Sequence, residues 1–100
     1  MPHLICYDIS ANTLRTKISR KIQEYGLDRI NKSVYLGNIS ESSLTNLELL
    51  IHKWLQAKGD PQDSLIIIPV TAAQIHQMKV YGLNELDKEE LSGDKSTLII

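Results

Sequence analysis

One carboxylate stands out near the start of the chain, because it interrupts a run of apolar residues. The segment Leu4-Ile5-Cys6-Tyr7-Asp8-Ile9 predicts a buried strand in which Asp8 is the charged member. A buried carboxylate needs a partner, a metal or a proton. Two interpretations are open: Asp8 is a metal ligand, or it is a strand-end residue that turns toward the next loop. In an extended strand Asp8 shares a face with Leu4 and Cys6, whereas Tyr7 points to the other face.

Basic residues gather in the segment that follows this strand. The net charge of -1 gives no argument for a nucleic-acid partner, but the charges are unevenly distributed. Six of the 11 basic residues lie close together in the sequence: Arg15, Lys17, Arg20, Lys21, Arg29 and Lys32. Acidic residues collect near the C-terminus, at Glu85, Asp87, Glu89, Glu90 and Asp94. We expect a basic end and an acidic tail, with the basic residues forming either a solvated helix face or a contact for a partner.

The length and the cysteine content narrow the class of protein. A chain of 100 residues makes one domain. Its single cysteine, Cys6, excludes an intrachain disulfide and favours a reducing compartment. No apolar run is long enough for a membrane span or a signal peptide, so we expect a cytoplasmic protein without membrane contact. His3, His52 and His76 show no zinc spacing, and no Gly-rich phosphate loop follows a strand.

The periodicity of apolar residues predicts the elements that position these side chains. We expect a first strand over residues 4–10, a helix over 12–25 and a strand over 29–39 that is kinked or broken at Asn31-Lys32-Ser33. A second helix begins after Ser40 and closes at Gly59. A strand over 63–70, a capped helical turn over 71–74 and a last short strand over 77–83 follow.

This order of elements is that of an α+β, ferredoxin-like βαββαβ sandwich with an added C-terminal edge strand. We expect one domain over residues 1–83 and an acidic tail over 84–100, in which Leu98-Ile99-Ile100 either docks as a strand or stays free. Two helices cover one face of such a sheet, yet the first and fourth strands are apolar on both faces. A second copy of the chain is the simplest cover, which predicts a homodimer packed through the sheets.

Several of these segments resemble one known family. They are Tyr7-Asp8-Ile9, Arg15 with Lys17, the run from Gly26 to Tyr35, and Ile66-Ile67-Ile68-Pro69-Val70-Thr71. In their order and spacing they make the chain similar, over roughly residues 3–83, to the CRISPR-associated protein 2 family of small dimeric nuclease-like proteins. The resemblance implies a ferredoxin-like homodimer in which Asp8 of each protomer reaches a shared Mg²⁺ site, with Mn²⁺ as a substitute. It also implies antiviral defence through spacer acquisition, a larger integrase partner, and binding of duplex DNA or single-stranded RNA.

The resemblance also assigns roles to individual residues. It implies that Asp8 is the catalytic residue and the metal ligand, that Arg15, Lys17 and Arg29 contact nucleic acid, and that Tyr7, Ser33 and Tyr35 support the site. We add Lys32 to the nucleic-acid contacts from the basic cluster. Two positions depart from the family pattern: Asn31 stands where Gln is common, and Lys17 where Arg is common. Lys17 keeps the charge but loses the bidentate fork of Arg.

The chemistry of a single carboxylate supports the need for a pair. Mg²⁺ takes about six oxygen ligands, typically one or two carboxylates with water and phosphate, so Asp8 twice across a two-fold axis is a plausible site. The leading hypothesis is a magnesium-dependent endonuclease that cleaves phosphodiester bonds of RNA or DNA. The second is a non-catalytic scaffold that binds duplex DNA for the integrase. The third is a toxin-like ribonuclease of the same fold, which the fold alone does not separate from the others.

Overall fold

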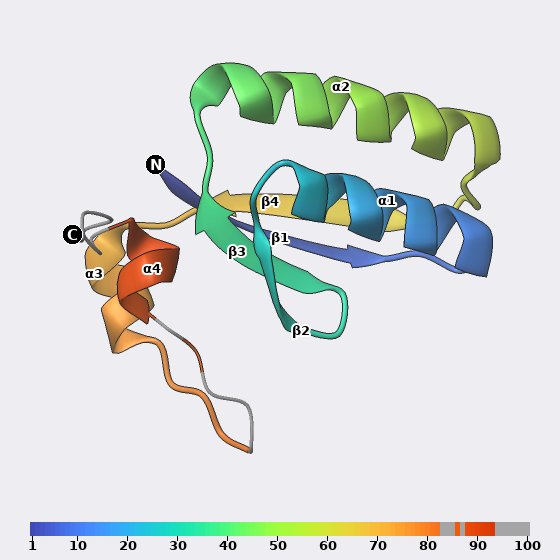
Figure 1. Ribbon diagram of the computed structural model, residues 1–100. Coiled ribbons are helices and arrows are strands. Elements are labelled where there is room, and N and C mark those ends of the chain that lie inside the picture. Colours follow the sequence, from blue (N-terminus) through green and yellow to red (C-terminus); the bar gives the residue numbers. More distant parts are fainter. Residues whose placement is uncertain (83–85, 87, 94–100) are drawn as a thin grey trace.

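The computed structural model describes residues 1–82, 86 and 88–93 of the chain (Figure 1). The strands are β1 (Pro2–Asp8), β2 (Asp28–Asn31), β3 (Val34–Asn38) and β4 (Ser64–Pro69). The helices are α1 (Asn12–Glu24), α2 (Glu41–Lys58), α3 (Ala72–Gln77) and α4 (Lys88–Ser92). The four strands form one antiparallel sheet in the order β2-β3-β1-β4. This confirms the predicted ferredoxin-like fold, in which α1 joins β1 to β2 while β3 lies between those two strands.

Helices α1 and α2 lie side by side on one face of the sheet (Figure 1). We call this the covered face, because its strand side chains pack against both helices in the main hydrophobic core. Ile5 of β1 is fully buried there, as are Ile18 of α1 and Leu47 of α2. The apolar stripe predicted for the first helix is therefore the surface that α1 buries. Burial of this stripe, rather than helix propensity, holds α1 in place.

The predicted strand over residues 29–39 is broken at its polar trio into β2 and β3. Ser33 occupies the turn with φ of 61°, a left-handed conformation that suits a short hairpin connection. Its carbonyl oxygen accepts a hydrogen bond from the backbone N–H of Tyr7 at 3.1 Å. This bond ties the tip of the hairpin to the C-terminal part of β1, next to Asp8.

Gly37 lies in the middle of β3, where the connection between α1 and β2 crosses it. A Cβ atom at this position would lie 3.0 Å from the Cα atom of Leu27 and 3.2 Å from the carbonyl oxygen of Gly26. Backbone approaches backbone here, so neither side has a flexible side chain that can move away. Glycine is needed at position 37 for the close approach rather than for its conformational freedom.

The other face of the sheet is covered at one end only. Leu4 of β1 and Leu36 of β3 belong to a second apolar cluster with Ile75 of α3 and Leu91 of α4. Toward the other end of β1, Cys6 is paired with Ile66 of β4 and is only half-buried. Ile66 and Ile68 remain 54% and 44% exposed. We call this surface the open face, defined by Cys6, Asp8, Val34, Ile66 and Ile68.

The C-terminal part of the chain differs from the prediction. The capped turn after β4 is confirmed: Thr71 and Gln74 form a reciprocal capping box at the start of α3. The strand expected over residues 77–83 is wrong for the described residues, since α3 extends to Gln77 and residues 78–82 pair with no strand. Met78 packs into the second cluster, while Tyr81 is 87% exposed. The sheet has free edges at β2 and β4, but the described part of this segment pairs with neither.

Part of the predicted acidic tail forms α4, which packs on α3 and on β3 (Figure 1). The expected docking of residues 98–100 lies outside the described residues. None of the helices formed by the described residues has the length and apolar character needed to cross a membrane.

Candidate nucleic-acid interface

Asp8 is the last residue of β1 and projects from the open face. It is paired with Ser64 at the start of β4, and its side chain is exposed. Two residues earlier on the same face lies Cys6, between Val34 and Ile66 on the neighbouring strands. Asp8 is therefore not buried in the single chain, contrary to the buried carboxylate considered from the sequence, and lies at the end of the strand as in the alternative interpretation. The predicted metal ligand is therefore accessible from solvent in the single chain.

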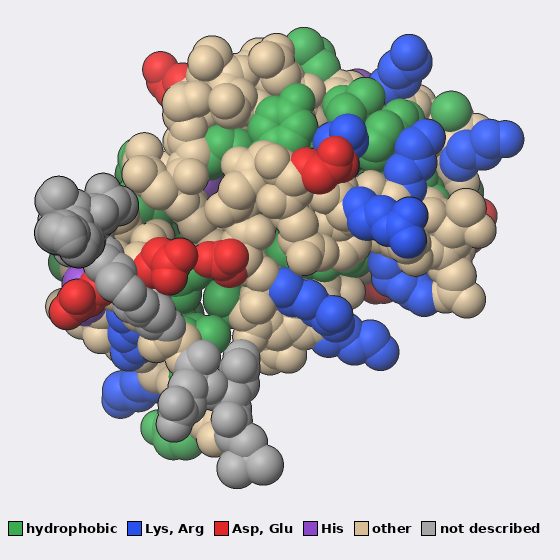
Figure 2. Space-filling view, viewed as in Figure 1, with side chains coloured by type: hydrophobic (Ala, Val, Ile, Leu, Met, Phe, Trp, Pro, Cys, Tyr) green, Lys and Arg blue, Asp and Glu red, His purple; other side chains and the backbone are tan. Residues whose placement is uncertain are grey.

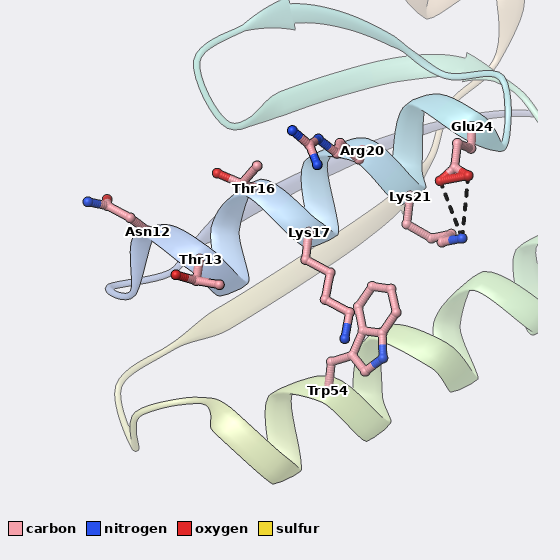
Figure 3. Close-up of a pocket in the computed structure, with 8 residues that line it drawn as sticks. All are labelled: Asn12, Thr13, Thr16, Lys17, Arg20, Lys21, Glu24 and Trp54. Atoms are coloured by element: carbon pink, nitrogen blue, oxygen red, sulfur yellow. Dashed lines mark hydrogen bonds and ion pairs between the residues drawn. The ribbon is translucent and has the colours of Figure 1, made fainter.

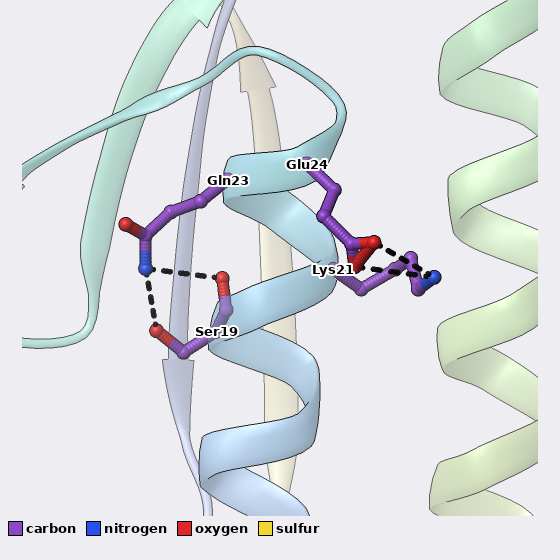
Figure 4. Close-up of polar contacts among 4 residues, drawn as sticks. All are labelled: Ser19, Lys21, Gln23 and Glu24. Carbon is purple, nitrogen blue, oxygen red and sulfur yellow. Dashed lines mark hydrogen bonds and ion pairs between the residues drawn. The ribbon is translucent and has the colours of Figure 1, made fainter.

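Tyr7 points in the opposite direction, under α1. Its hydroxyl oxygen lies 3.0 Å from that of Tyr35, and the two rings stack with their centroids 5.8 Å apart. The Oγ atom of Ser19 lies 2.5 Å from the hydroxyl oxygen of Tyr35. Gln23 extends the chain of hydrogen bonds, because its Nε2 donates to Ser19 Oγ at 3.0 Å (Figure 4). The hydroxyls of the covered face are thus satisfied by one another, as buried polar groups must be.

This arrangement changes the acidity of Tyr7. Burial, and after it the hydrogen bond with Tyr35, raises the pKa of the Tyr7 hydroxyl above its ordinary value. The neutral phenol is therefore favoured, and Tyr7 serves as a hydrogen-bonding group of the site rather than as a base at neutral pH.

A pocket of about 310 Å³ opens beside these tyrosines. We call it the tyrosine pocket; it is lined by Tyr7, Arg15, Thr16, Ser19, Arg20, Arg29, Lys32, Ser33 and Tyr35. Four of these residues are cationic and none is acidic. Hydroxyl and guanidinium donors around a concave surface match the oxygens of a phosphate group. The structure thus brings together six of the residues singled out from the sequence: Tyr7, Arg15, Arg29, Lys32, Ser33 and Tyr35.

The cations of the tyrosine pocket differ in how firmly they are held. Arg15 is half-buried, and its Nη1 donates to the carbonyl oxygen of Ile9 at 2.9 Å while its Nη2 donates to Asn12 Oδ1. Arg15 therefore fixes the connection between β1 and α1. Within the described part of the chain, Arg20, Arg29 and Lys32 form no ion pair; the one recorded there joins Lys21 to Glu24 (Figure 4). Three charges in this pocket are available to a ligand.

Lys17 lies outside the tyrosine pocket. Its side chain runs along α1 toward α2, and its Nζ atom is 4.2 Å from the centroid of the Trp54 ring (Figure 3). At a partly exposed site such a cation–π contact contributes about 0.5–1 kcal/mol. The structure separates Lys17 from Arg15 and Arg29, with which the resemblance had grouped it.

Asp63 holds the loop that leaves β1, a role that no pattern in the sequence indicated. Its Oδ1 accepts hydrogen bonds from the backbone N–H and from the hydroxyl of Ser10, both at 3.0 Å. Its Oδ2 accepts the backbone N–H of Asp60 at 2.9 Å. These N–H donors, led by that of Asp60, lower the pKa of the Asp63 carboxyl. The Asp63 carboxylate is thus committed to holding Ser10, which lies two residues after Asp8.

The fit of this surface to a divalent cation is limited in one chain. Among the described residues, no group of three or more His, Cys, Asp or Glu side chains could hold a metal ion. Asp8 contributes one carboxylate, and Asp63 is committed to the loop. A magnesium site with two carboxylates therefore requires a second copy of Asp8.

Two side chains near the tyrosine pocket were missed or left unassigned by the sequence reasoning. Ser19 was not noticed at all, although it lies one turn after Arg15 and flanks the apolar stripe of α1. Arg20 was recognised as basic but was given no site role. Both become site residues only because α1 crosses the sheet above Tyr35, a tertiary relation that the helical period does not contain.

Comparisons with known proteins agree with this geometry. Residues 1–78 match the family model described as CRISPR associated protein Cas2. A protein of Korarchaeum cryptofilum named CRISPR-associated endoribonuclease Cas2 is 31% identical over 67% of this chain and 69% of its own length. A protein of Francisella tularensis subsp. novicida, CRISPR-associated endoribonuclease Cas2 1, is 32% identical over 86% of this chain and 82% of its own length.

Solved structures give the same fold. The hypothetical protein TT1823 from Thermus thermophilus is 29% identical with a TM-score of 0.70, covering 85% of this chain and 94% of that one. Cas2 of Streptococcus pyogenes also has a TM-score of 0.70, at 15% identity, over 82% of this chain and 100% of that one. With the family model matching most of its length, the chain belongs to the CRISPR-associated Cas2 family.

Proposed function

We propose that this protein is a CRISPR-associated endonuclease that cleaves phosphodiester bonds as a homodimer, with Asp8 as its catalytic carboxylate. The position of Asp8 carries the proposal: an exposed carboxylate at the end of β1, on the face that also carries the exposed side chains of Ile66 and Ile68. Curated relatives that are named endoribonucleases support RNA as one substrate.

The open face supports the homodimer. Ile66 and Ile68 are large apolar side chains that the single chain leaves largely exposed, and a patch of this kind marks an interaction surface. A two-fold axis presents the same patch on both copies, so an apolar strip covers itself. Helices α3 and α4 already occupy one end of this face. The second copy therefore sits at the other end, where the two Asp8 side chains approach one another.

A pair of Asp8 side chains fits Mg²⁺, with Mn²⁺ as a substitute. Such an ion is bound by one or two carboxylates and completes its shell with water and a substrate phosphate. When bound, it stabilises the negative charge that develops on the phosphate and lowers the pKa of a coordinated water. The role of the two Asp8 carboxylates is to hold the metal ion at the dimer axis.

The tyrosine pocket supplies the grip on the substrate. Arg20, Arg29 and Lys32 bind backbone phosphates, and the hydroxyls of Tyr7 and Ser33 border the same space. Arg15 acts as a positioning residue, because its bond to Ile9 fixes the exit of β1 and hence the direction of Asp8. The pocket and Asp8 lie on opposite faces of the sheet but at the same end of β1. The bound strand therefore passes around this end.

Cleavage by the Asp8→Asn variant tests the proposal directly. Single-stranded RNA and duplex DNA are incubated with wild type and variant over a titration of Mg²⁺ and of Mn²⁺. We expect the variant to lose metal-dependent cleavage while sedimentation still reports a dimer. Asp28→Asn, a matched change at another exposed acid, on β2, is expected to retain activity. Equal cleavage by wild type and Asp8→Asn would refute the role of Asp8.

A second candidate function is a non-catalytic scaffold that binds duplex DNA for a larger integrase during spacer acquisition. Two observations favour it: each chain contributes only one carboxylate, Asp8, to the proposed metal site, and the tyrosine pocket contains cations that form no ion pair with the described residues. Replacing Arg29 and Lys32 by Gln is then expected to reduce the slope of log affinity against log salt by about two, since each phosphate contact contributes about 0.9. A dimer that binds duplex DNA and cuts neither substrate with either metal would favour the scaffold over the nuclease.

Both roles belong to antiviral defence in the cytoplasm. The single cysteine is compatible with a reducing compartment, and it forms no disulfide in the described structure.

A further inference from the structure

The outer surface of the helix layer carries an aromatic side chain that the proposed function does not use. Trp54 is the only tryptophan of the chain. It projects from α2 toward α1, where part of it packs on the main core and part remains accessible. Lys17 of α1 reaches across and places its ammonium group over the ring (Figure 3).

A groove runs along both sides of this contact. One hollow, of about 610 Å³, lies between Trp54 and the exposed side of α1. A second, of about 500 Å³, lies toward the end of α2, and the two share Thr13, Lys17 and Trp54. We call their union the Trp54 groove; the residues that matter for it are Thr13, Lys17, Arg20, Lys21, Trp54 and Lys58.

The charge of the Trp54 groove is strongly positive. Its lining contains four cations and one acid, Glu24, and that acid is already paired with Lys21 at 3.3 Å (Figure 3). In the space-filling view, Lys and Arg side chains gather over the side of the molecule that α1 and the C-terminal part of α2 occupy (Figure 2). The contact with Trp54 accounts for Lys17, but within the described residues Arg20 and Lys58 have no acidic partner.

The groove is continuous with the tyrosine pocket. Thr16 and Arg20 line both of them, so the two concavities meet over α1. A ligand that leaves the tyrosine pocket across Arg20 therefore enters the Trp54 groove directly. This gives one basic path from the end of β1 to an aromatic ring on α2.

We propose that the Trp54 groove binds a single-stranded segment of nucleic acid, with one base stacked on the indole of Trp54. The phosphates on either side contact Lys17 and Arg20. Binding moves the ammonium group of Lys17 from the ring to a phosphate, so the cation exchanges one electrostatic partner for another. Basic grooves that track the backbone and contain an aromatic platform are the usual means of binding single strands.

The aromatic platform decides between single strands and other partners. In a duplex the bases are stacked on one another inside the helix, so none can lie on Trp54 without leaving its neighbours. An acidic protein would use the cations but has no need of the indole face. The inference goes beyond the proposed nuclease, because the groove lies on the helix layer and Asp8 lies on the open face of the sheet.

Tryptophan fluorescence tests the inference without any substitution, since Trp54 is the sole tryptophan. The wild-type protein is titrated in metal-free buffer, where cleavage does not interfere, with single-stranded oligouridine of about ten nucleotides. Binding is measured in parallel by the anisotropy of a label on the RNA. We expect the indole emission to be quenched in proportion to binding. Saturated binding with unchanged emission would overturn the inference, and quenching by polyglutamate to the same extent would reduce the groove to a charge effect and overturn it too.

Two variants of Trp54 separate stacking from packing. Trp54→Leu is expected to weaken binding of the oligouridine about tenfold, the effect of losing one stacked base, while Trp54→Phe recovers most of it. Leu49→Ala, a change at an exposed apolar residue of α2 that does not line the groove, is the control and should bind as wild type. Thermal unfolding of each variant checks the fold. Unchanged affinity of a folded Trp54→Leu variant, or an equal loss with duplex DNA, would contradict the inference.

These results are independent of the nuclease assay. Loss of cleavage in Asp8→Asn with normal quenching supports both proposals. Normal cleavage chemistry in a protein whose emission never responds to bound RNA refutes the groove alone.

Discussion

The two faces of the sheet differ in how far their side chains are covered within one chain. On the covered face, Ile5 is sealed under two helices, and the hydroxyls of Tyr7, Tyr35 and Ser19 bond to one another. On the open face, Ile66 remains half exposed and Asp8 has no described partner beyond solvent. The covered face buries its apolar side chains within one chain, whereas the open face leaves Ile66 and Ile68 largely exposed, which is the basis of the proposed homodimer. The comparison teaches that the same strands bury a complete apolar core on one side and leave large apolar side chains accessible on the other.

Truncating one isoleucine on each face gives the largest contrast. Ile5→Ala is expected to lower the free energy of unfolding by about 3 kcal/mol, because it leaves a cavity in the main core. Ile66→Ala is expected to cost less than about 1 kcal/mol when the protein is dilute enough to be monomeric. Both changes replace Ile by Ala in a strand, but β1 is central and β4 is an edge strand, so strand position adds to the contrast in burial.

Chemical denaturation at several protein concentrations measures this contrast. If the open face forms the dimer interface, the cost of Ile66→Ala grows with protein concentration, because association stabilises the folded state by mass action. A cost that is large and independent of concentration would mean that Ile66 is already covered within one chain.

Removing one hydroxyl from the covered face gives an intermediate effect. Tyr35→Phe deprives Tyr7 and Ser19 of a shared partner, so we expect a loss of about 1–2 kcal/mol in the free energy of unfolding. Urea titration of wild type and variant provides the measurement. Tyr81→Phe is the matched control, since Tyr81 is 87% exposed and should respond within error. Equal effects of the two changes would show that the hydroxyl chain contributes nothing to stability.

The smallest effect is a dependence on alkaline pH. Because the pKa of Tyr7 is raised in the folded protein, its neutral form contributes stability that is fully present below the unfolded value of about 10. This contribution is lost as the pH rises through the folded pKa. We expect wild type to lose more unfolding free energy than Tyr7→Phe between about pH 9 and pH 11. Parallel slopes for the two proteins over this range would contradict the assignment.

Much of the fold was predictable because it depends on local pattern. The alternation in β1 placed Tyr7 and Asp8 on opposite faces, and the polar trio at Asn31 marked the break between β2 and β3. The capping box at Thr71 was visible as a sequence of residue types. Each of these features is decided by neighbours within about four positions, which is the range over which a helix or strand period acts.

The predictions that were wrong concern features that depend on contacts between distant segments. The segment after α3 has the composition of a strand, but its described residues pair with neither edge strand of the sheet, β2 or β4. Lys17 resembles its neighbour Arg15 in charge and position, yet one turns to Trp54 and the other to Ile9. Whether a cation of α1 belongs to the tyrosine pocket depends on the angle at which the helix crosses the sheet. The pairing of Asp8 across a dimer axis stays a prediction.

Gly37 has no side chain, so the backbone of the turn after α1 lies directly against β3 at this position. Because Leu27 and Gly26 rest directly on β3, the turn after α1 is held at the shortest distance that two backbones allow. A methyl group at position 37 would press on this backbone, so Gly26 and Leu27 would have to move by a few tenths of an ångström to admit it. The contact between the turn after α1 and β3 is therefore set by a residue that has no side chain of its own.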